Sequence, residues 1–262
     1  MELETILGDP VSDARPTPIL FVHGMAHAAW CWTEHFLPYF TKHGYVCHAL
    51  SLRGHGKSEG QKRLRWTSLV EYVSDVAKVA GQMERPPILV GHSMGGMIVQ
   101  KYLESNRAPA AVLLASVPPQ GAIRATLRVA FRHPVVFMKA NLMMSMYPMF
   151  GTPQLAQEAL FSADMPIDKV LTYTSMLQDE SYRAYLDMMG LNLPRPERVN
   201  TPILVMGAAD DRLISTSEIE STAKAYHTKA EIFPGMAHDM MLEDGWRAVA
   251  IRLLCWLDSQ GL

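Results

Sequence analysis

The sequence predicts a doubly wound, mostly parallel α/β sheet with a helical cap insertion. Three observations support this prediction: short apolar runs begin beside prolines, helical patterns lie between these runs, and one long segment shows helical patterns only. The chain has 262 residues, which is enough for one large hydrophobic core or two small domains.

Four short runs rich in Val, Ile and Leu begin at or just after a proline. None of them alternates between apolar and polar residues, which is typical of strands buried on both faces of a parallel sheet. Proline is tolerated at the first position of a strand, where it interrupts no ladder of hydrogen bonds. The runs are residues 18–22, 87–90, 109–114 and 202–205, and two further candidate strands are residues 45–50 and 230–233.

Helical patterns separate these candidate strands. Apolar residues recur at helical spacing in residues 68–82, and helix-forming runs cover residues 94–105 and 246–257. Ser215 and Glu218 form a capping-box pattern that predicts a helix running toward Tyr226. Strands that alternate with helices are typical of a doubly wound sheet.

One segment, residues 119–196, contains no convincing strand. Its prolines divide it into several short helical patterns, so we expect a helical cap over the carboxyl edge of the sheet. The core domain would then comprise residues 1–118 and 197–262. In sheets of this type the ligand crevice lies at that same edge.

Composition narrows the class of protein further. The formal net charge of -2 offers no broad basic field for nucleic acid. Three cysteines without paired spacing favour neither zinc nor a disulfide framework, and they suit a reducing compartment. The N-terminus lacks the pattern of a secretory signal, and no run of about 18 apolar residues is present. We therefore expect a cytoplasmic monomer or homodimer without a membrane span and without a nucleic-acid partner.

The segment Gly91-His92-Ser93-Met94-Gly95 matches the pattern G-x-S-x-G. An apolar run precedes it and a helical run follows it, which is the strand-turn-helix setting of a nucleophilic serine. Such a turn is sharp, and a side chain at either glycine would crowd it. Ser93 is therefore the candidate nucleophile.

Together with His23-Gly24-Met25 after an earlier apolar run, this segment resembles the α/β-hydrolase superfamily. The resemblance extends over nearly all of residues 18–257, with the cap covered least, and is strongest to esterases, monoacylglycerol lipases and lysophospholipases. It implies an oxyanion hole formed by the backbone amides of Met25 and Met94.

The order of a triad in this family is serine, acid, histidine. His238 lies in a loop directly after residues 230–233, where the family has its general base, whereas His227 is expected at the surface. Two adjacent aspartates compete for the acid. Counting forward from the preceding strand selects Asp210. However, residues 211–215 better match the segment that leads from the acid into the next helix in this family. We favour Asp211 and keep Asp210 as the second candidate.

These residues predict hydrolysis of a carboxylic ester through an acyl-enzyme, with a small or medium apolar ester as substrate. No metal or organic cofactor is implied. A thioesterase or a lactonase would use the same groups. Two further functions fit the same residues: that of a lyase similar to hydroxynitrile lyases, and that of a ligand receptor without catalysis.

Two further features of the sequence are a cluster of methionines and a pair of neighbouring tryptophans. Nine of the 18 methionines lie between Met138 and Met189, which predicts either an adaptable cap surface or ordinary packing of the cap. An adaptable surface would line an acyl pocket or make a weak interfacial contact. Trp30 and Trp32 resemble aromatic residues that pack against the sheet near the first helix of plant relatives.

Overall fold

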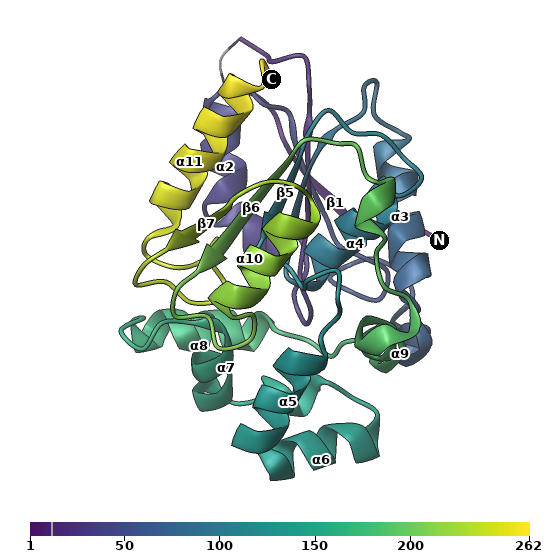
Figure 1. Ribbon diagram of the computed structural model, residues 1–262, viewed down its shortest axis with the longest axis vertical. Helices are drawn as coiled ribbons and strands as arrows, with labels where there is room; N and C mark the ends of the chain where they lie inside the picture. The colour runs from purple at the N-terminus through teal and green to yellow at the C-terminus, as the bar shows by residue number, and fades with distance from the viewer. Residues whose placement is uncertain (12) are drawn as a thin grey trace.

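The computed structural model describes residues 1–11 and 13–262. Its seven-stranded sheet has the order β1-β3-β2-β4-β5-β6-β7, and every neighbouring pair except β1 and β3 is parallel (Figure 1). The strands are β1 (Thr5–Gly8), β2 (Ile19–Val22), β3 (Cys47–Leu50), β4 (Ile88–His92), β5 (Ala111–Leu114), β6 (Ile203–Ala208) and β7 (Ala230–Phe233). The predicted fold class is therefore confirmed.

All six predicted strands are present, but β1 was missed. This strand is short and lies at the edge of the sheet, where its Leu7 side chain is exposed. An edge strand with one solvated face has no continuous apolar run, so the pattern that identified the buried strands is absent from it. It pairs antiparallel with β3, and Thr5 lies opposite Leu50.

Helices cover both faces of the sheet, and the side chains of β2 point alternately into the hydrophobic cluster on each face. Ile19 and Phe21 pack into one hydrophobic cluster, while Leu20 and Val22 pack into the other. The first cluster lies under α1 (Trp30–Thr33), α2 (Phe36–Lys42) and α11 (Trp246–Ser259), and the second under α3 (Leu69–Ala80), α4 (Met94–Leu103) and α10 (Thr216–Ala225). The predicted capping box of α10 is present, with the Ser215 amide 2.9 Å from a Glu218 carboxylate oxygen.

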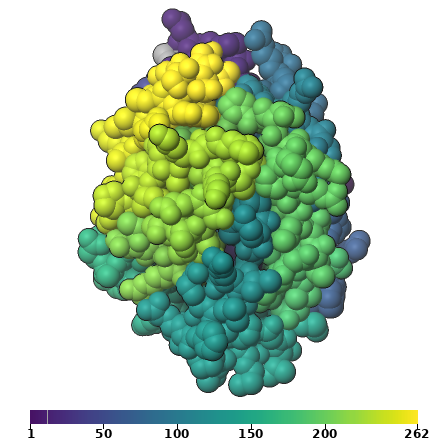
Figure 2. Space-filling view, in the orientation of Figure 1, coloured from purple at the N-terminus to yellow at the C-terminus, as the bar shows by residue number. Residues whose placement is uncertain are grey.

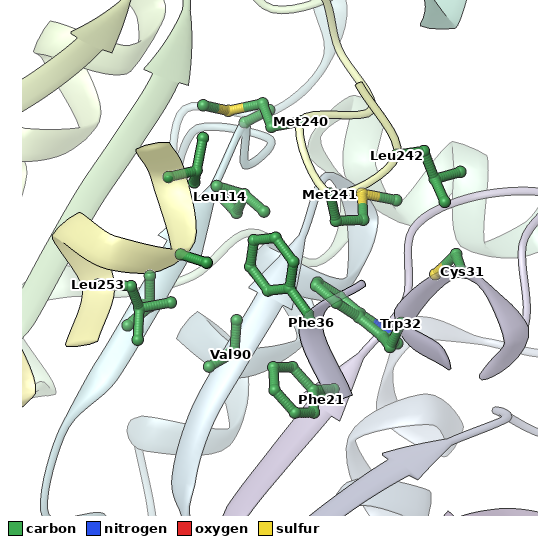
Figure 3. Close-up of a cluster of buried hydrophobic side chains, with 14 of the residues drawn as sticks. Phe21, Cys31, Trp32, Phe36, Val90, Leu114, Met240, Met241, Leu242 and Leu253 are labelled. Carbon is green, nitrogen blue, oxygen red and sulfur yellow. The ribbon is translucent and has the colours of Figure 1, made fainter. Parts of the chain in front are cut away.

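The first cluster is built around aromatic rings (Figure 3). Trp32 is fully buried and stacks on Phe21 with 5.0 Å between ring centroids, so the expected packing of this residue on the sheet is confirmed. Phe36 packs against the same two rings. Met240 and Met241 join the cluster from the loop that follows His238, and this contact fixes the path of that loop.

A helical insertion covers the carboxyl ends of the strands, as predicted (Figure 1). It contains α5 (Ile123–Arg132), α6 (Pro134–Met143), α7 (Pro153–Leu160), α8 (Ile167–Met176), α9 (Tyr182–Leu186) and the short turns η2 (Tyr147–Met149), η3 (Asp187–Leu191) and η4 (Pro196–Arg198). A further short helix, η1 (Gln61–Trp66), belongs to the body. The division into a core and a cap at residues 119 and 196 stays a prediction.

Within the residues that the structure describes, we find no helix with the length and apolar character needed to cross a lipid bilayer.

Replacing Trp32 with alanine should lower the free energy of unfolding by about 3–5 kcal/mol, because it leaves a cavity against Phe21. Urea denaturation monitored by circular dichroism measures this loss. Leu191→Ala is the matched control, since Leu191 is exposed and its truncation should change stability by less than about 0.5 kcal/mol. Equal losses in the two variants would contradict the packing described for Trp32.

Candidate active site

Ser93 occupies a tight turn between β4 and α4. Its backbone has φ 52° and ψ -118°, a conformation that costs free energy in a residue with a side chain. Gly95 makes the turn possible, because a Cβ atom there would lie 2.3 Å from the Val22 carbonyl oxygen. A Cβ atom on Gly91 would lie 2.6 Å from the Gly95 carbonyl oxygen. The two glycines of the motif are thus required by close backbone contacts.

In the structure the side chain of His238 lies within hydrogen-bond distance of both Ser93 and Asp211. The Ser93 Oγ atom lies 2.9 Å from Nε2 of His238, and Nδ1 of the same ring lies 2.7 Å from a carboxylate oxygen of Asp211. A carboxylate only accepts, so Nδ1 carries the proton and Nε2 is free to accept from the hydroxyl group. This arrangement can deprotonate the serine as it attacks an electrophile.

Asp211, not Asp210, contacts the histidine. Its side chain is fully buried. The carboxylate oxygen that does not face His238 accepts hydrogen bonds from the backbone amides of Leu213 and Ile214 at 2.7 and 2.9 Å. These bonds hold the carboxylate facing His238. Asp210 is exposed, and among the described residues it forms no hydrogen bond or ion pair with that ring.

The environment of His238 favours its charged form. Burial lowers the pKa of the ring, but the charge of Asp211 and its hydrogen bond outweigh burial. The pKa of His238 is consequently raised above its usual value of 6.5. A raised pKa suits a group that must hold a proton while a tetrahedral intermediate exists.

The Met25 amide is oriented by a histidine of the preceding turn. Nδ1–H of His23 donates to the Gly24 carbonyl oxygen at 2.8 Å, and Nε2 accepts from the Leu52 amide at 3.0 Å. Burial lowers the pKa of His23 well below its usual value, so this tautomer is neutral. The carbonyl and the N–H of a trans peptide point in opposite directions, and the Met25 N–H therefore points away from His23.

Two close contacts complete the candidate oxyanion site. A Cβ atom on Gly24 would lie 2.9 Å from Cβ of Ser93, so glycine lets this loop approach the nucleophile. Met94 is the first residue of α4, where a helix leaves its amide without an intrahelical acceptor. Both expected donors thus belong to segments that adjoin Ser93.

A buried ion pair that sequence reasoning missed lies behind His238. Nε2 of His27 lies 2.9 Å from the carboxylate of Asp239, and its Nδ1 lies 2.8 Å from the Met25 carbonyl oxygen. Both neighbouring oxygens are acceptors, so this geometry suits a His27 ring that donates from both nitrogens. Although burial raises the pKa of Asp239, the charge and hydrogen bond of His27 bring it below its usual value.

This ion pair links the two loops of the candidate site. His27 belongs to the loop of Met25, and Asp239 follows His238 directly. His92 joins them, because its Nε2 donates to the His238 carbonyl oxygen at 3.0 Å. Burial lowers the pKa of His92 to about 3, so this ring is neutral. The only feature of this network that the sequence could have indicated is the acidic residue, Asp239, directly after His238.

Glu180 of the cap is a second residue that sequence reasoning missed. Its carboxylate accepts a hydrogen bond from the Tyr72 hydroxyl group at 2.6 Å and lies 3.1 Å from Nε2 of His55. The Ala26 amide donates to it at 3.4 Å, and the Gln178 amide donates to the Ala26 carbonyl oxygen at 3.0 Å. Ala26 has φ 65°, so contacts from the cap hold the strained residue that follows Met25.

An apolar cavity of about 90 Å³ adjoins Ser93 and His238. Its lining includes the methionines Met25, Met94, Met146, Met149 and Met188. Three of these belong to the cap, so cap methionines do line the pocket next to the candidate nucleophile. Figure 2 shows a hollow in the surface where the teal atoms of the cap meet the yellow-green atoms of the later chain.

One group of side chains has the spacing of metal ligands. Ligand atoms of His92, His238 and Asp239 lie within 4.8 Å of one another. Both ring nitrogens of His238 already face Ser93 and Asp211, so an ion held by this histidine would have to displace one of them. The three side chains therefore fit their hydrogen bonds to protein atoms better than they fit a resident metal.

Replacing Asp239 with asparagine should lower the free energy of unfolding by about 1–3 kcal/mol, because the buried hydrogen bond from His27 then loses its charged acceptor. Thermal or urea denaturation measures this loss. The double variant Asp239→Asn/His27→Gln should be less destabilised than the sum of the two single variants. Additive losses would show that the two side chains do not form the ion pair described.

Comparison with known proteins identifies the family. The model of the alpha/beta hydrolase family matches residues 19–252. A monoacylglycerol lipase of Mycolicibacterium smegmatis is 27% identical over 95% of this chain and 90% of its own. A non-heme chloroperoxidase of Streptomyces lividans is 35% identical over 39% of this chain and 37% of its own. The crystal structure of a monoacylglycerol lipase of Paleococcus ferrophilus superimposes with a TM-score of 0.74, 20% identity and coverage of 99% and 100%. The chain therefore belongs to the alpha/beta hydrolase family.

Proposed function

We propose that this alpha/beta hydrolase cleaves carboxylic esters, with Ser93 as nucleophile, His238 as general base and acid, and Asp211 as the orienting acid. The observation that carries the proposal is the continuous line of hydrogen bonds from Asp211 through His238 to Ser93. The curated relative named as a monoacylglycerol lipase supports an esterase or lipase type of activity.

The reaction follows from this geometry in two halves. Ser93 Oγ attacks the ester carbonyl carbon while Nε2 of His238 takes the hydroxyl proton. The amides of Met25 and Met94 donate to the resulting oxyanion. Collapse of the intermediate breaks the ester C–O bond, and His238 gives its proton to the leaving alcohol. Water then attacks the acyl-enzyme with His238 again as base, which releases the carboxylic acid and restores Ser93.

The cavity supports a small or medium apolar acyl group as the substrate. Its volume of about 90 Å³ is smaller than the roughly 150 Å³ of an engineered apolar cavity that accepts benzene. A longer acyl chain would therefore require the cap to shift. Methionine side chains such as Met146 and Met149 can adapt their shape to such a chain.

The rival functions make different experimental predictions. A thioesterase or lactonase would use the same residues and would differ only in substrate profile. A lyase would cleave its substrate without accumulating an acyl-enzyme, and a receptor would bind ligand tightly with negligible turnover. Ester hydrolysis is preferred because the relative that matches over 95% of this chain is named as a monoacylglycerol lipase.

A fluorophosphonate probe should label Ser93 in the native protein, and p-nitrophenyl esters should be hydrolysed with an optimum at short acyl chains. Mass spectrometry of the labelled peptide and a chain-length series measure the two effects. Ser93→Ala is the control and should lose both label and turnover. A native protein that takes no label and hydrolyses no ester would contradict the proposed function.

Asp211→Asn should lower kcat by about 10⁴-fold, because the ring of His238 would lose its correct tautomer. Asp210→Asn, a matched change at the exposed neighbour, should leave kcat nearly unchanged. A reversed order of effects would assign the acid to Asp210.

The pH dependence of kcat/KM gives a separate measurement on the native enzyme. Activity requires neutral His238, whose pKa is raised above 6.5, so kcat/KM should rise with pH and reach half its maximum above pH 6.5. A midpoint below that value would show that Asp211 does not stabilise the charged ring.

A further inference from the structure

The outer face of α5 carries a stripe of exposed apolar side chains. Ile123, Leu127 and Phe131 follow one another at intervals of four residues, so they lie on one side of the helix. All three are exposed, and Phe131 has 83% of its surface accessible. The opposite side of the helix lines the cavity beside Ser93 through Ala125 and Val129.

Helix α6 extends this apolar surface, which we call the cap patch. Val135, Met138 and Leu142 are exposed at helical spacing, with accessible fractions of 71% for Val135 and 79% for Leu142. Figure 1 shows α5 and α6 side by side at the end of the molecule farthest from the C-terminus, and the contacts between the two helices agree. Exposed apolar side chains gathered on two neighbouring helices in this way are typical of an interaction site.

Basic residues flank the cap patch and no acidic residue interrupts it. Arg124, Arg128 and Arg132 form a second stripe on α5, and Lys139 adjoins the apolar residues of α6. No aspartate or glutamate occurs in residues 105–157. Arg128 and Arg132 contact the acids Glu218 and Glu158 of other segments, whereas Arg124 and Lys139 have no ion-pair partner in residues 1–11 and 13–262.

A groove leads from the cap patch toward the cavity. Phe131 lines this groove together with Arg132 and Arg212, and its volume is about 480 Å³. Arg132 and Arg212 share a single carboxylate, that of Glu158, at 2.6 and 3.8 Å, so the rim carries an excess of positive charge. The groove and the catalytic cavity share the wall residues Val129, Met149, Phe150 and Leu213.

From these features we infer that the cap patch docks on an anionic lipid surface. Exposed apolar side chains beside basic ones are typical of helices that lie in a membrane interface. The groove would then give an amphiphilic ester a route from that surface toward Ser93; this role in delivery rests on the proposed function. A second copy of the chain fits less well, because a twofold interface would set the same basic stripe against itself.

Co-sedimentation with lipid vesicles tests the docking directly. The native protein should bind vesicles of phosphatidylcholine mixed with phosphatidylglycerol much more tightly than vesicles of phosphatidylcholine alone. Binding should weaken when the salt concentration rises from about 0.1 M to about 1 M, because the screening length falls to about 3 Å. Light scattering without lipid reports whether the protein associates with itself.

Two double variants separate the apolar from the electrostatic contribution to vesicle binding. Phe131→Ser/Leu142→Ser should weaken binding to the anionic vesicles at least about tenfold, because both apolar anchors are lost. Arg124→Gln/Lys139→Gln should weaken it about fivefold per charge and should remove the preference for anionic lipid. The matched controls Val70→Ser and Lys62→Gln, at exposed positions of the body, should bind like the native protein.

The outcomes distinguish this inference from the proposed function. Equal binding to both kinds of vesicle, no effect of the patch variants, or a dimer abolished by Phe131→Ser/Leu142→Ser would overturn the docking inference. Hydrolysis of soluble p-nitrophenyl esters is measured in parallel and should be unchanged in Arg124→Gln/Lys139→Gln, Val70→Ser and Lys62→Gln, whose altered residues line neither the groove nor the cavity. Docking without any ester turnover would instead overturn the proposed function and leave lipid docking supported.

Discussion

The rest of the site depends on one close approach between backbones. The turn that carries Ser93 is packed so tightly against the end of β2 that only glycine fits at position 95. This contact forces Ser93 into a strained conformation and sets its hydroxyl group at the carboxyl edge of the sheet. It also brings the Met25 loop, which follows β2, next to Ser93. A single packing constraint therefore positions both the candidate nucleophile and the candidate oxyanion donors.

Buried polar contacts then fix the loops that the sheet alone leaves free. His27 and Asp239 join the Met25 loop to the His238 loop, and Glu180 joins the Met25 loop to the cap. Such contacts are strong because the low dielectric of the interior screens the attraction between polar groups only weakly. Buried polar contacts consequently join the Met25 loop both to the His238 loop and to the cap.

The sequence predicted those parts of the fold and of the candidate site that a local pattern of residues encodes. The buried strands appeared as apolar runs beside prolines, and the motif around Ser93 together with the order of the triad located His238. The choice of Asp211 rested on a loop pattern, and the amides of Leu213 and Ile214 supply its physical reason. Strand β1 lacked an apolar run. The partners of Glu180 are distant in sequence, so no periodicity or motif could have paired them.

The central claim is that Ser93 forms an acyl-enzyme during ester hydrolysis. Rapid-quench mass spectrometry with a p-nitrophenyl ester tests it most directly. The account predicts a burst of p-nitrophenol close to one equivalent when deacylation is slow, together with an acyl group on the peptide that contains Ser93. Turnover of the ester with no acylated peptide, or with the acyl group on another residue, would contradict the account.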